Sequence, residues 1–197
     1  MAVVDTNNGA VLAMIGGRDY TVRRGLNRAT QMRRQPGSAL KPLAVYGPAL
    51  ELGYTTASVL LDEKTNFGGY TPRNAGDRYY GLVTMRTAIR NSLNTTAVRL
   101  LEEIGLDASI QYLNKMGIPT RNSDRNLSLA LGSMTYGVTP VELAAAYVPY
   151  ANGGIYHQPY CVERIETVDG SNVYERKDSG KQVLSAQNAF LMTSLLQ

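Results

Sequence analysis

The chain has 197 residues, of which 44% are hydrophobic and 18% are charged, and its formal net charge is +4. This length and composition predict one domain, or most of one, with a buried core, and exclude a disordered tail. No apolar run approaches the ~20 residues that cross a bilayer, and the first residues lack the basic and apolar regions of a signal peptide.

The only cysteine is Cys161 and the only histidine is His157. One cysteine excludes an internal disulfide, and so few ligands argue against a zinc cluster. We therefore expect no metal and no other cofactor. Both residues are interpreted as structural, with Cys161 as a small buried apolar group.

The positive charge is concentrated before residue 35, in six arginines: Arg18, Arg23, Arg24, Arg28, Arg33 and Arg34. Such a run can face an anionic partner. We favour a solvated loop whose arginines pair with local carboxylates, because no nucleic-acid-binding signature accompanies the cluster. No nucleic acid is expected as a partner.

The first predicted element is a β-hairpin, formed by the apolar runs 2–5 and 10–15 around Asn7-Asn8-Gly9. Asparagine and glycine tolerate the positive φ of a hairpin turn. The polar stretch from Arg18 to Gln35 is typical of a loop with room for one short helix, and Pro36-Gly37 predicts a turn after it.

Apolar spacing predicts a buried helix over 39–52. Proline is tolerated in a first helical turn, so Pro42 favours a helix that begins close to Ser38. Residues before proline are pushed toward extended conformations, so we also expect Lys41 to depart from helical dihedrals. Pro48 predicts a kink or an early end.

An irregular excursion or short hairpin is expected over 61–80, which contains several glycines and a proline and has no helical period. Helices are predicted at 84–90 and 95–104. Between them, Asn91-Ser92-Leu93-Asn94 contains residues typical of helix caps. A loop between two helices therefore presents two polar side chains.

Three more helices are predicted, at 107–116, at 140–151 and from Ser185 to Gln197. A second hairpin is predicted from 162–168 paired with 172–176. An apolar helix that stops without a cap indicates a chain that was cut and not finished.

Ser38-Ala39-Leu40-Lys41 carries the clearest chemical signal. Residues at i and i+3 share one face of a helix, so a neutral Lys41 could accept the proton of Ser38 and activate it for acyl transfer. Alone the pattern is weak, because helix capping also explains a serine after Pro36-Gly37.

The neighbouring residues add a resemblance. Ser38-Ala39-Leu40-Lys41, followed by Ser92-Leu93-Asn94, resembles the first two motifs of the transpeptidase domain of a bacterial class A penicillin-binding protein, in the penicillin-recognising serine acyltransferase superfamily. The blocks 81–86 and 137–144 are also similar to family blocks, so the resemblance spans nearly the whole chain.

This resemblance implies an α+β fold of the β-lactamase/transpeptidase type, in which helices flank an antiparallel sheet beside an all-helical subdomain. The third family motif, Lys-Thr-Gly, is absent. We therefore expect residues 1–197 to be the N-terminal major part of the domain, truncated before the strand that carries it. A companion C-terminal segment would supply that strand and half of the oxyanion hole.

The resemblance also implies residue roles. Ser38 would be the acylated nucleophile, Lys41 its proton acceptor, Ser92 a proton relay and Asn94 a substrate-binding residue. The implied partners are peptidoglycan stem peptides and β-lactam antibiotics. Ser38 would attack the carbonyl between two terminal D-alanines of a stem peptide and expel D-alanine, and an amine of a neighbouring stem would then take the acyl group; β-lactams would acylate the same serine. The implied location is the extracytoplasmic face of the bacterial membrane, through an anchor outside this chain.

Two alternatives remain open. One is a β-lactamase-like hydrolase of the same fold, although no Glu-x-x-x-Asn pattern follows Ser92 to supply a deacylating base. The other is a non-catalytic basic module that binds an anionic polymer through the arginine cluster.

Overall fold

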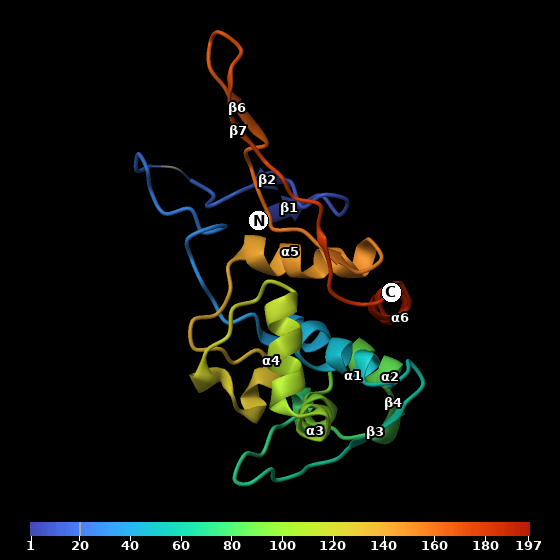
Figure 1. Cartoon of the computed structure of the whole chain (residues 1–197). Helices are drawn as coiled ribbons and strands as arrows, with labels where there is room; N and C mark the ends of the chain where they lie inside the picture. The colour runs from blue at the N-terminus through green and yellow to red at the C-terminus, as the bar shows by residue number, and fades with distance from the viewer. Residues whose placement is uncertain (20) are drawn as a thin grey trace.

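The computed structural model describes residues 1–19 and 21–197, which contain both helices and short strands (Figure 1). The helices are η1 (Gly37–Leu40), η2 (Pro42–Tyr46), α1 (Gly47–Glu51), η3 (Ala75–Asp77), α2 (Met85–Arg90), α3 (Asn94–Ile104), α4 (Leu106–Lys115), η4 (Asn122–Asp124), η5 (Leu127–Leu131), α5 (Pro140–Ala151) and α6 (Ala186–Leu196). The strands are β1 (Ala2–Val4), β2 (Val11–Met14), β3 (Val59–Asp62), β4 (Gly81–Thr84), β5 (Ile155–Tyr156), β6 (Arg164–Glu166), β7 (Asn172–Glu175) and β8 (Lys181–Gln182).

Two hairpins predicted from the sequence are confirmed. β1 pairs antiparallel with β2, with Ala2 opposite Met14, and β6 pairs antiparallel with β7. The β1–β2 hairpin lies over α5, whereas β6 and β7 project away from the helices (Figure 1). α5 therefore separates the N-terminal hairpin from the helical part of the molecule.

The structure also contains strands at the ends of 61–80, where an irregular excursion or a short hairpin was expected, and a strand pair near the C-terminus that was not predicted. β3 and β4 pair antiparallel at the two ends of the irregular excursion, with Asp62 opposite Gly81. β5 pairs with β8 in the same way. Within the described residues the strands form four separate two-stranded sheets and not one extended sheet.

The helix expected over 39–52 is built from three different turns. It begins as the 3₁₀ turn η1, widens into the π-helical turn η2, and ends as α1. The expectation for Lys41 was wrong, because its φ of −52° and ψ of −46° are helical. Proline fixes φ and has no N–H, so it is tolerated in a first turn such as that of η2. Single π turns of this kind occur within helices.

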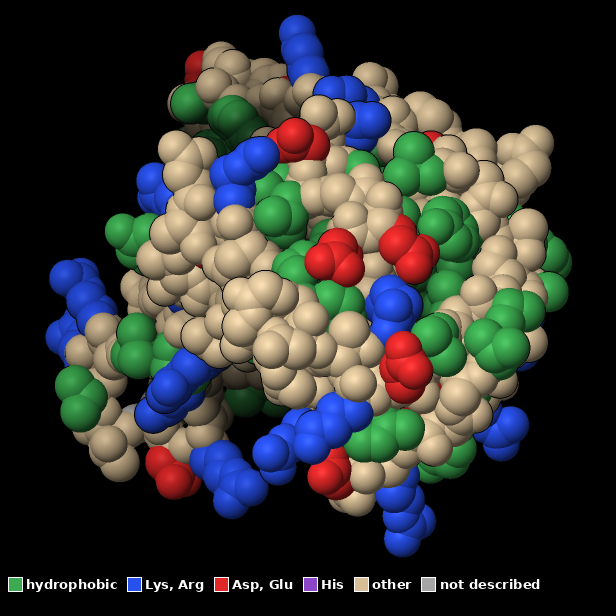
Figure 2. All heavy atoms as spheres, turned by 90° about the horizontal axis from the view of Figure 1, so that it is seen from below, with side chains coloured by type: hydrophobic (Ala, Val, Ile, Leu, Met, Phe, Trp, Pro, Cys, Tyr) green, Lys and Arg blue, Asp and Glu red, His purple; other side chains and the backbone are tan. Residues whose placement is uncertain are grey.

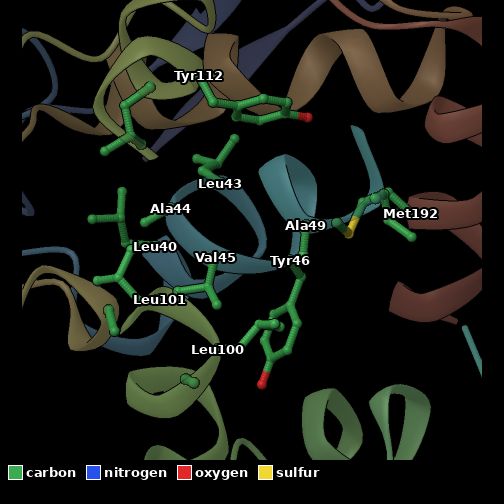
Figure 3. Close-up of a cluster of buried hydrophobic side chains, with 14 of the residues drawn as sticks. Leu40, Leu43, Ala44, Val45, Tyr46, Ala49, Leu100, Leu101, Tyr112 and Met192 are labelled. Carbon is green, nitrogen blue, oxygen red and sulfur yellow. The ribbon is translucent and has the colours of Figure 1, made fainter. Parts of the chain in front are cut away.

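This segment forms the centre of the hydrophobic core (Figure 3). Leu40, Leu43 and Val45 are fully buried. Leu100 and Leu101 of α3 pack against them from one side, and residues of α4 and α6 close the others. Burying each large apolar side chain stabilises the fold by about 1.5–3 kcal/mol, so the segment that carries the serine motif is held firmly.

α5 begins and ends at the residues predicted. Its N-terminus is a capping box: Thr139 Oγ1 accepts from Glu142 N at 3.2 Å, and Glu142 Oε2 accepts from Thr139 N at 2.9 Å. Pro140 occupies the first turn, where no N–H is needed. Local sequence alone specifies this helix start.

The interpretation of Cys161 as buried was wrong, because its side chain is exposed. His157 is 8% exposed, and its Nδ1 lies 3.5 Å from Asp178 Oδ2. His157 is thus packed in the structure, whereas Cys161 lies in a surface segment between β5 and β6.

The arginine cluster is largely solvated but does not pair locally. Among the described residues, Arg33 is its only member in an ion pair, and the partner, Glu142, lies far along the chain. On the face shown in Figure 2, basic side chains stand mostly around the rim, with acidic and apolar side chains between them. Within the described part of the chain, no helix is long and apolar enough to span a membrane.

Candidate active site

Ser38 lies exposed in the first turn of η1. The turn before it requires Gly37, whose φ is +59°, a conformation that glycine adopts without strain. Gly132 backs onto this turn so closely that a Cβ there would lie 2.2 Å from Gly37 O. The structure therefore fixes the backbone around Ser38 from the side of η5.

Side chains from other helices hold the irregular helix that follows Ser38. Tyr147 Oη donates to Ala39 O at 2.6 Å, and Tyr150 Oη donates to Pro42 O at 2.9 Å. Tyr147 and Tyr150 come from α5. Ala39 belongs to η1, and Pro42 O also accepts from Gly47 N within the π-helical turn. The two hydroxyls therefore tie both irregular turns to α5.

Ser92 occupies a strained backbone position between α2 and α3. Its φ is +50°, which costs a residue with a Cβ about 1–2 kcal/mol. Its amide donates to Ile89 O at 2.9 Å and thereby closes α2. Strain of this kind is retained where it positions a functional group, and here it places Ser92 beside the side chain of Lys41.

Lys41 is the centre of the constellation. Its Nζ donates to Ser92 O at 2.6 Å, to Ser92 Oγ at 3.1 Å, to Leu93 O at 3.3 Å and to Asn94 Oδ1 at 2.6 Å. The residue is only 2% exposed. No carboxylate of the described residues forms an ion pair with it.

Burial without a carboxylate partner disfavours the charged ammonium. It lowers the pKa of Lys41 from 10.5 to about 8. A substantial fraction of the amine is then neutral just above neutral pH. A lysine in this state can act as a proton acceptor.

The structure brings together three of the four residues predicted for the site: Lys41, Ser92 and Asn94. Ser38 shares the helix of Lys41 but, within residues 1–19 and 21–197, its Oγ forms no hydrogen bond with the lysine. All four Nζ contacts run toward the segment 92–94. Ser38 is exposed to solvent and lies outside this set of hydrogen bonds.

Sequence reasoning missed two buried residues behind this site, Asp62 and Asn74. Asn74 Oδ1 accepts from the backbone N–H of Asn94 at 2.7 Å and of Thr95 at 3.2 Å, and so caps α3. The available signal is Leu93, which precedes α3 but has no side-chain acceptor to cap it. A helix start with an apolar N-cap position needs an acceptor from elsewhere.

Comparison with known protein families finds a match along the entire chain. The model of the penicillin binding protein transpeptidase domain matches residues 1–197. The chain belongs to the penicillin-binding protein transpeptidase family. The expectations for the family and for its mixed α and β fold are thereby confirmed.

Individual relatives support the assignment. The chain is 45% identical over 195 residues to penicillin-binding protein 1F of Bacillus subtilis, covering 98% of this chain and 27% of that protein. It is 36% identical over 209 residues to penicillin-binding protein 1A of Clostridium botulinum, covering 99% and 25%. The chain thus spans about a quarter of the length of these relatives.

Solved structures of family members share the fold. Penicillin-binding protein 1A of Haemophilus influenzae matches with a TM-score of 0.83 and 30% identity, over 99% of this chain and 34% of that one. PonA1 of Mycobacterium tuberculosis, solved in complex with penicillin V, matches with a TM-score of 0.87 and 25% identity, over 100% of this chain and 54% of that one.

Proposed function

We propose that this chain carries the acylation centre of a serine D,D-transpeptidase that cross-links peptidoglycan stem peptides. The single observation that supports this most is the buried Lys41, which contacts Ser92 and Asn94 and lies on the same helix as Ser38. Membership of the penicillin-binding protein transpeptidase family supports the proposed class of reaction.

In the proposed first half-reaction, Ser38 Oγ attacks the carbonyl between two terminal D-alanines. Neutral Lys41 accepts the hydroxyl proton as the C–O bond forms. A neutral amine has two N–H groups and one lone pair. Ser92 O and Asn94 Oδ1, each at 2.6 Å, are suited to take the two N–H groups, which leaves the lone pair for a hydroxyl.

Breakdown of the tetrahedral intermediate needs a proton on the leaving amine. In our proposal Ser92 relays it from Lys41, to which its Oγ lies at 3.1 Å. The C–N bond then breaks, D-alanine leaves, and an ester on Ser38 remains. An amine of a neighbouring stem peptide attacks this ester, forms the new amide and returns Ser38 to its free state.

The oxyanion of each intermediate requires hydrogen-bond donors. The backbone N–H of Ser38 is suited to be one, since N–H groups in a first helical turn have no intrahelical acceptor. We propose that a companion C-terminal segment with the Lys-Thr-Gly motif provides the second donor. Loss of one such donor costs ~10²–10³ in rate.

A fluorescent penicillin tests the proposal. The chain is mixed with the reagent in the presence and absence of the companion segment, and the labelled residue is found by mass spectrometry. We expect a stable adduct on Ser38 that requires the companion segment and is absent in Ser38→Ala. Ala39 is exposed beside Ser38, so Ala39→Ser serves as a matched control that keeps the nucleophile.

Other outcomes would point elsewhere. Rapid release of the label would favour the β-lactamase-like hydrolase. An absence of labelling in the presence of the companion segment would refute the transpeptidase proposal and favour a basic binding module. As a further part of the proposal, the domain acts outside the cytoplasmic membrane, where peptidoglycan strands are joined.

A further inference from the structure

Asn74 is a buried amide in the irregular segment between β3 and β4, and it is only 6% exposed. Its Nδ2 donates to Asp62 Oδ1 at 2.7 Å and to Arg78 O at 2.9 Å. Two acceptors on one side fix the amide, so its Oδ1 faces the start of α3. There it accepts the two N–H groups, of Asn94 and Thr95, that Leu93 leaves without a cap.

Asp62 orients this amide. It is fully buried at the end of β3, where Oδ2 accepts from Tyr80 N at 2.9 Å and Oδ1 also accepts from Thr95 Oγ1. Among the described residues no lysine or arginine forms an ion pair with it. A buried carboxyl held only by neutral donors is costly, and this one lies directly behind the second motif.

The same segment also fixes the side chain of Asn94. Asn94 Nδ2 donates to Arg73 O at 2.7 Å, so the opposite end of the amide, Oδ1, faces Lys41 Nζ at 2.6 Å. Residues 73 and 74 thus hold Asn94 by its side chain and by its backbone. Moving either contact would move the acceptor that Lys41 uses.

We propose that Asn74, oriented by Asp62, is a positioning residue for acylation: it sets the distance between the second motif and Lys41. The inference rests on the proposed function and extends it to a pair of residues outside the three family motifs. Catalytic groups displaced by ~1 Å can lose ~10²-fold in rate. We therefore expect Asn74→Ala to slow acylation of Ser38 by roughly that factor per folded molecule.

Two further variants separate positioning from simple stability. Asn74→Asp keeps an acceptor for the α3 cap but places a second carboxyl against Asp62. Combining it with Asp62→Asn restores the hydrogen bond between the two positions in the opposite direction. The amide at position 62 then donates, and the carboxylate at position 74 accepts. We expect the double variant to be acylated faster than Asn74→Asp alone.

Asn66 provides the matched control. It is an exposed asparagine of the same excursion, and its Oδ1 accepts from Gly69 N at 2.7 Å, a contact confined to its own turn. Asn66→Ala therefore removes a hydrogen bond of the same length without touching the second motif. We expect its acylation rate to equal that of the parent chain.

The experiment measures acylation by a fluorescent penicillin between pH 6 and 9, with the companion segment present, and divides each rate by the folded fraction. A second readout follows the titration of the Lys41 amine by NMR with ¹³C-labelled lysine. In Asn74→Ala the backbone of Asn94 loses its hydrogen bond to Asn74, so we expect the segment 92–94 to loosen and water to reach the Lys41 amine. The pKa of Lys41 should then rise toward its ordinary value, and the acylation profile should move to higher pH.

The two failures are distinguishable. If the parent chain forms no adduct on Ser38, the proposed function fails, while the Lys41 titration still decides the inference. If Asn74→Ala lowers only the folded fraction, and leaves the rate per folded molecule and the Lys41 titration unchanged, Asn74 is merely structural and the inference is overturned.

Discussion

Lys41→Met tests whether burial of the amine carries a cost in stability. Methionine has a similar length and no charge. The lowering of the Lys41 pKa from 10.5 to about 8 corresponds to about 3 kcal/mol, at about 1.4 kcal/mol for each tenfold change in proton affinity. This is the free energy by which the folded state disfavours the ammonium.

The direction with pH follows from proton binding. Between pH 8 and 10.5 the unfolded chain keeps the Lys41 proton while the folded chain has lost it, so the free energy of unfolding rises with pH. Below about pH 8 both states hold the proton and the full cost is present. From pH 7 to 10 the parent should therefore gain about 2–3 kcal/mol relative to Lys41→Met.

Urea unfolding followed by circular dichroism at pH 7, 8, 9 and 10 measures this difference. Burial raises the pKa of Tyr112 and Tyr150, which lowers stability above pH 10 in both proteins, so the series stops there. Lys115 is exposed at the end of α4, and Lys115→Met should run parallel to the parent. If the free energy of unfolding changes with pH in the same way for the parent and for Lys41→Met, the assignment of a buried, desolvated amine is refuted.

Three other predictions concern the same region. The rate of acylation of Ser38 by a penicillin should rise about fivefold from pH 7 to 8. A lysine with a pKa of about 8 is about one-tenth neutral at pH 7 and half neutral at pH 8. An acylation rate that does not change with pH would argue against Lys41 as the base. Gly132→Ala should lower the free energy of unfolding by about 2 kcal/mol or more, since its φ is +77° and its Cβ would meet Gly37 O; unchanged urea curves would contradict this. Tyr147→Phe should cost about 1 kcal/mol by the same assay, for the lost hydrogen bond to η1, and an unchanged midpoint would show that this bond does not contribute.

The sequence was informative where local signals decide the structure. α5 was predicted with both ends correct, because Pro140 suits a first helical turn and Asn152-Gly153-Gly154 suits a helix end. The structure adds a capping box between Thr139 and Glu142 at its start. α6 begins after Ser185, whose side chain accepts from Asn188 N at 3.2 Å. In both cases the acceptor lies one turn from the donor, so no tertiary information is needed.

Lys41 shows where local rules fail. Its position before Pro42 disfavours a helical backbone, yet the chain there is helical. Leu40 and Leu43 are fully buried on either side, and the hydroxyl of Tyr150 satisfies Pro42 O from a distant helix. Packing and tertiary hydrogen bonds outweigh a local preference, and neither was visible in the sequence.

The structure brings together Lys41, Ser92 and Asn94, which the sequence proposed for the site, but the residues that hold them in place were not predicted. Ser92 and Asn94 were identified from their motif, whereas the cap on α3 comes from a residue 20 positions earlier. No periodicity connects Asn74 to that helix. The pairing of β3 with β4 closes the excursion, and the contacts of Asp62 with Asn74 and Thr95 bring the two together.

Three features of the site are unfavourable in isolation. Within residues 1–19 and 21–197, Lys41 is buried without a carboxylate partner and Asp62 is buried without a cation, and Ser92 has a positive φ. Lys41, Ser92 and Asp62 are linked through Asn94 and Asn74 by hydrogen bonds of 2.6–3.1 Å. A network with most of its partners satisfied tolerates such groups, while loss of one member leaves the others buried without partners. Substitutions at Asn74 and at Lys41 should therefore be non-additive, with the double variant less impaired in stability than the sum of the single variants.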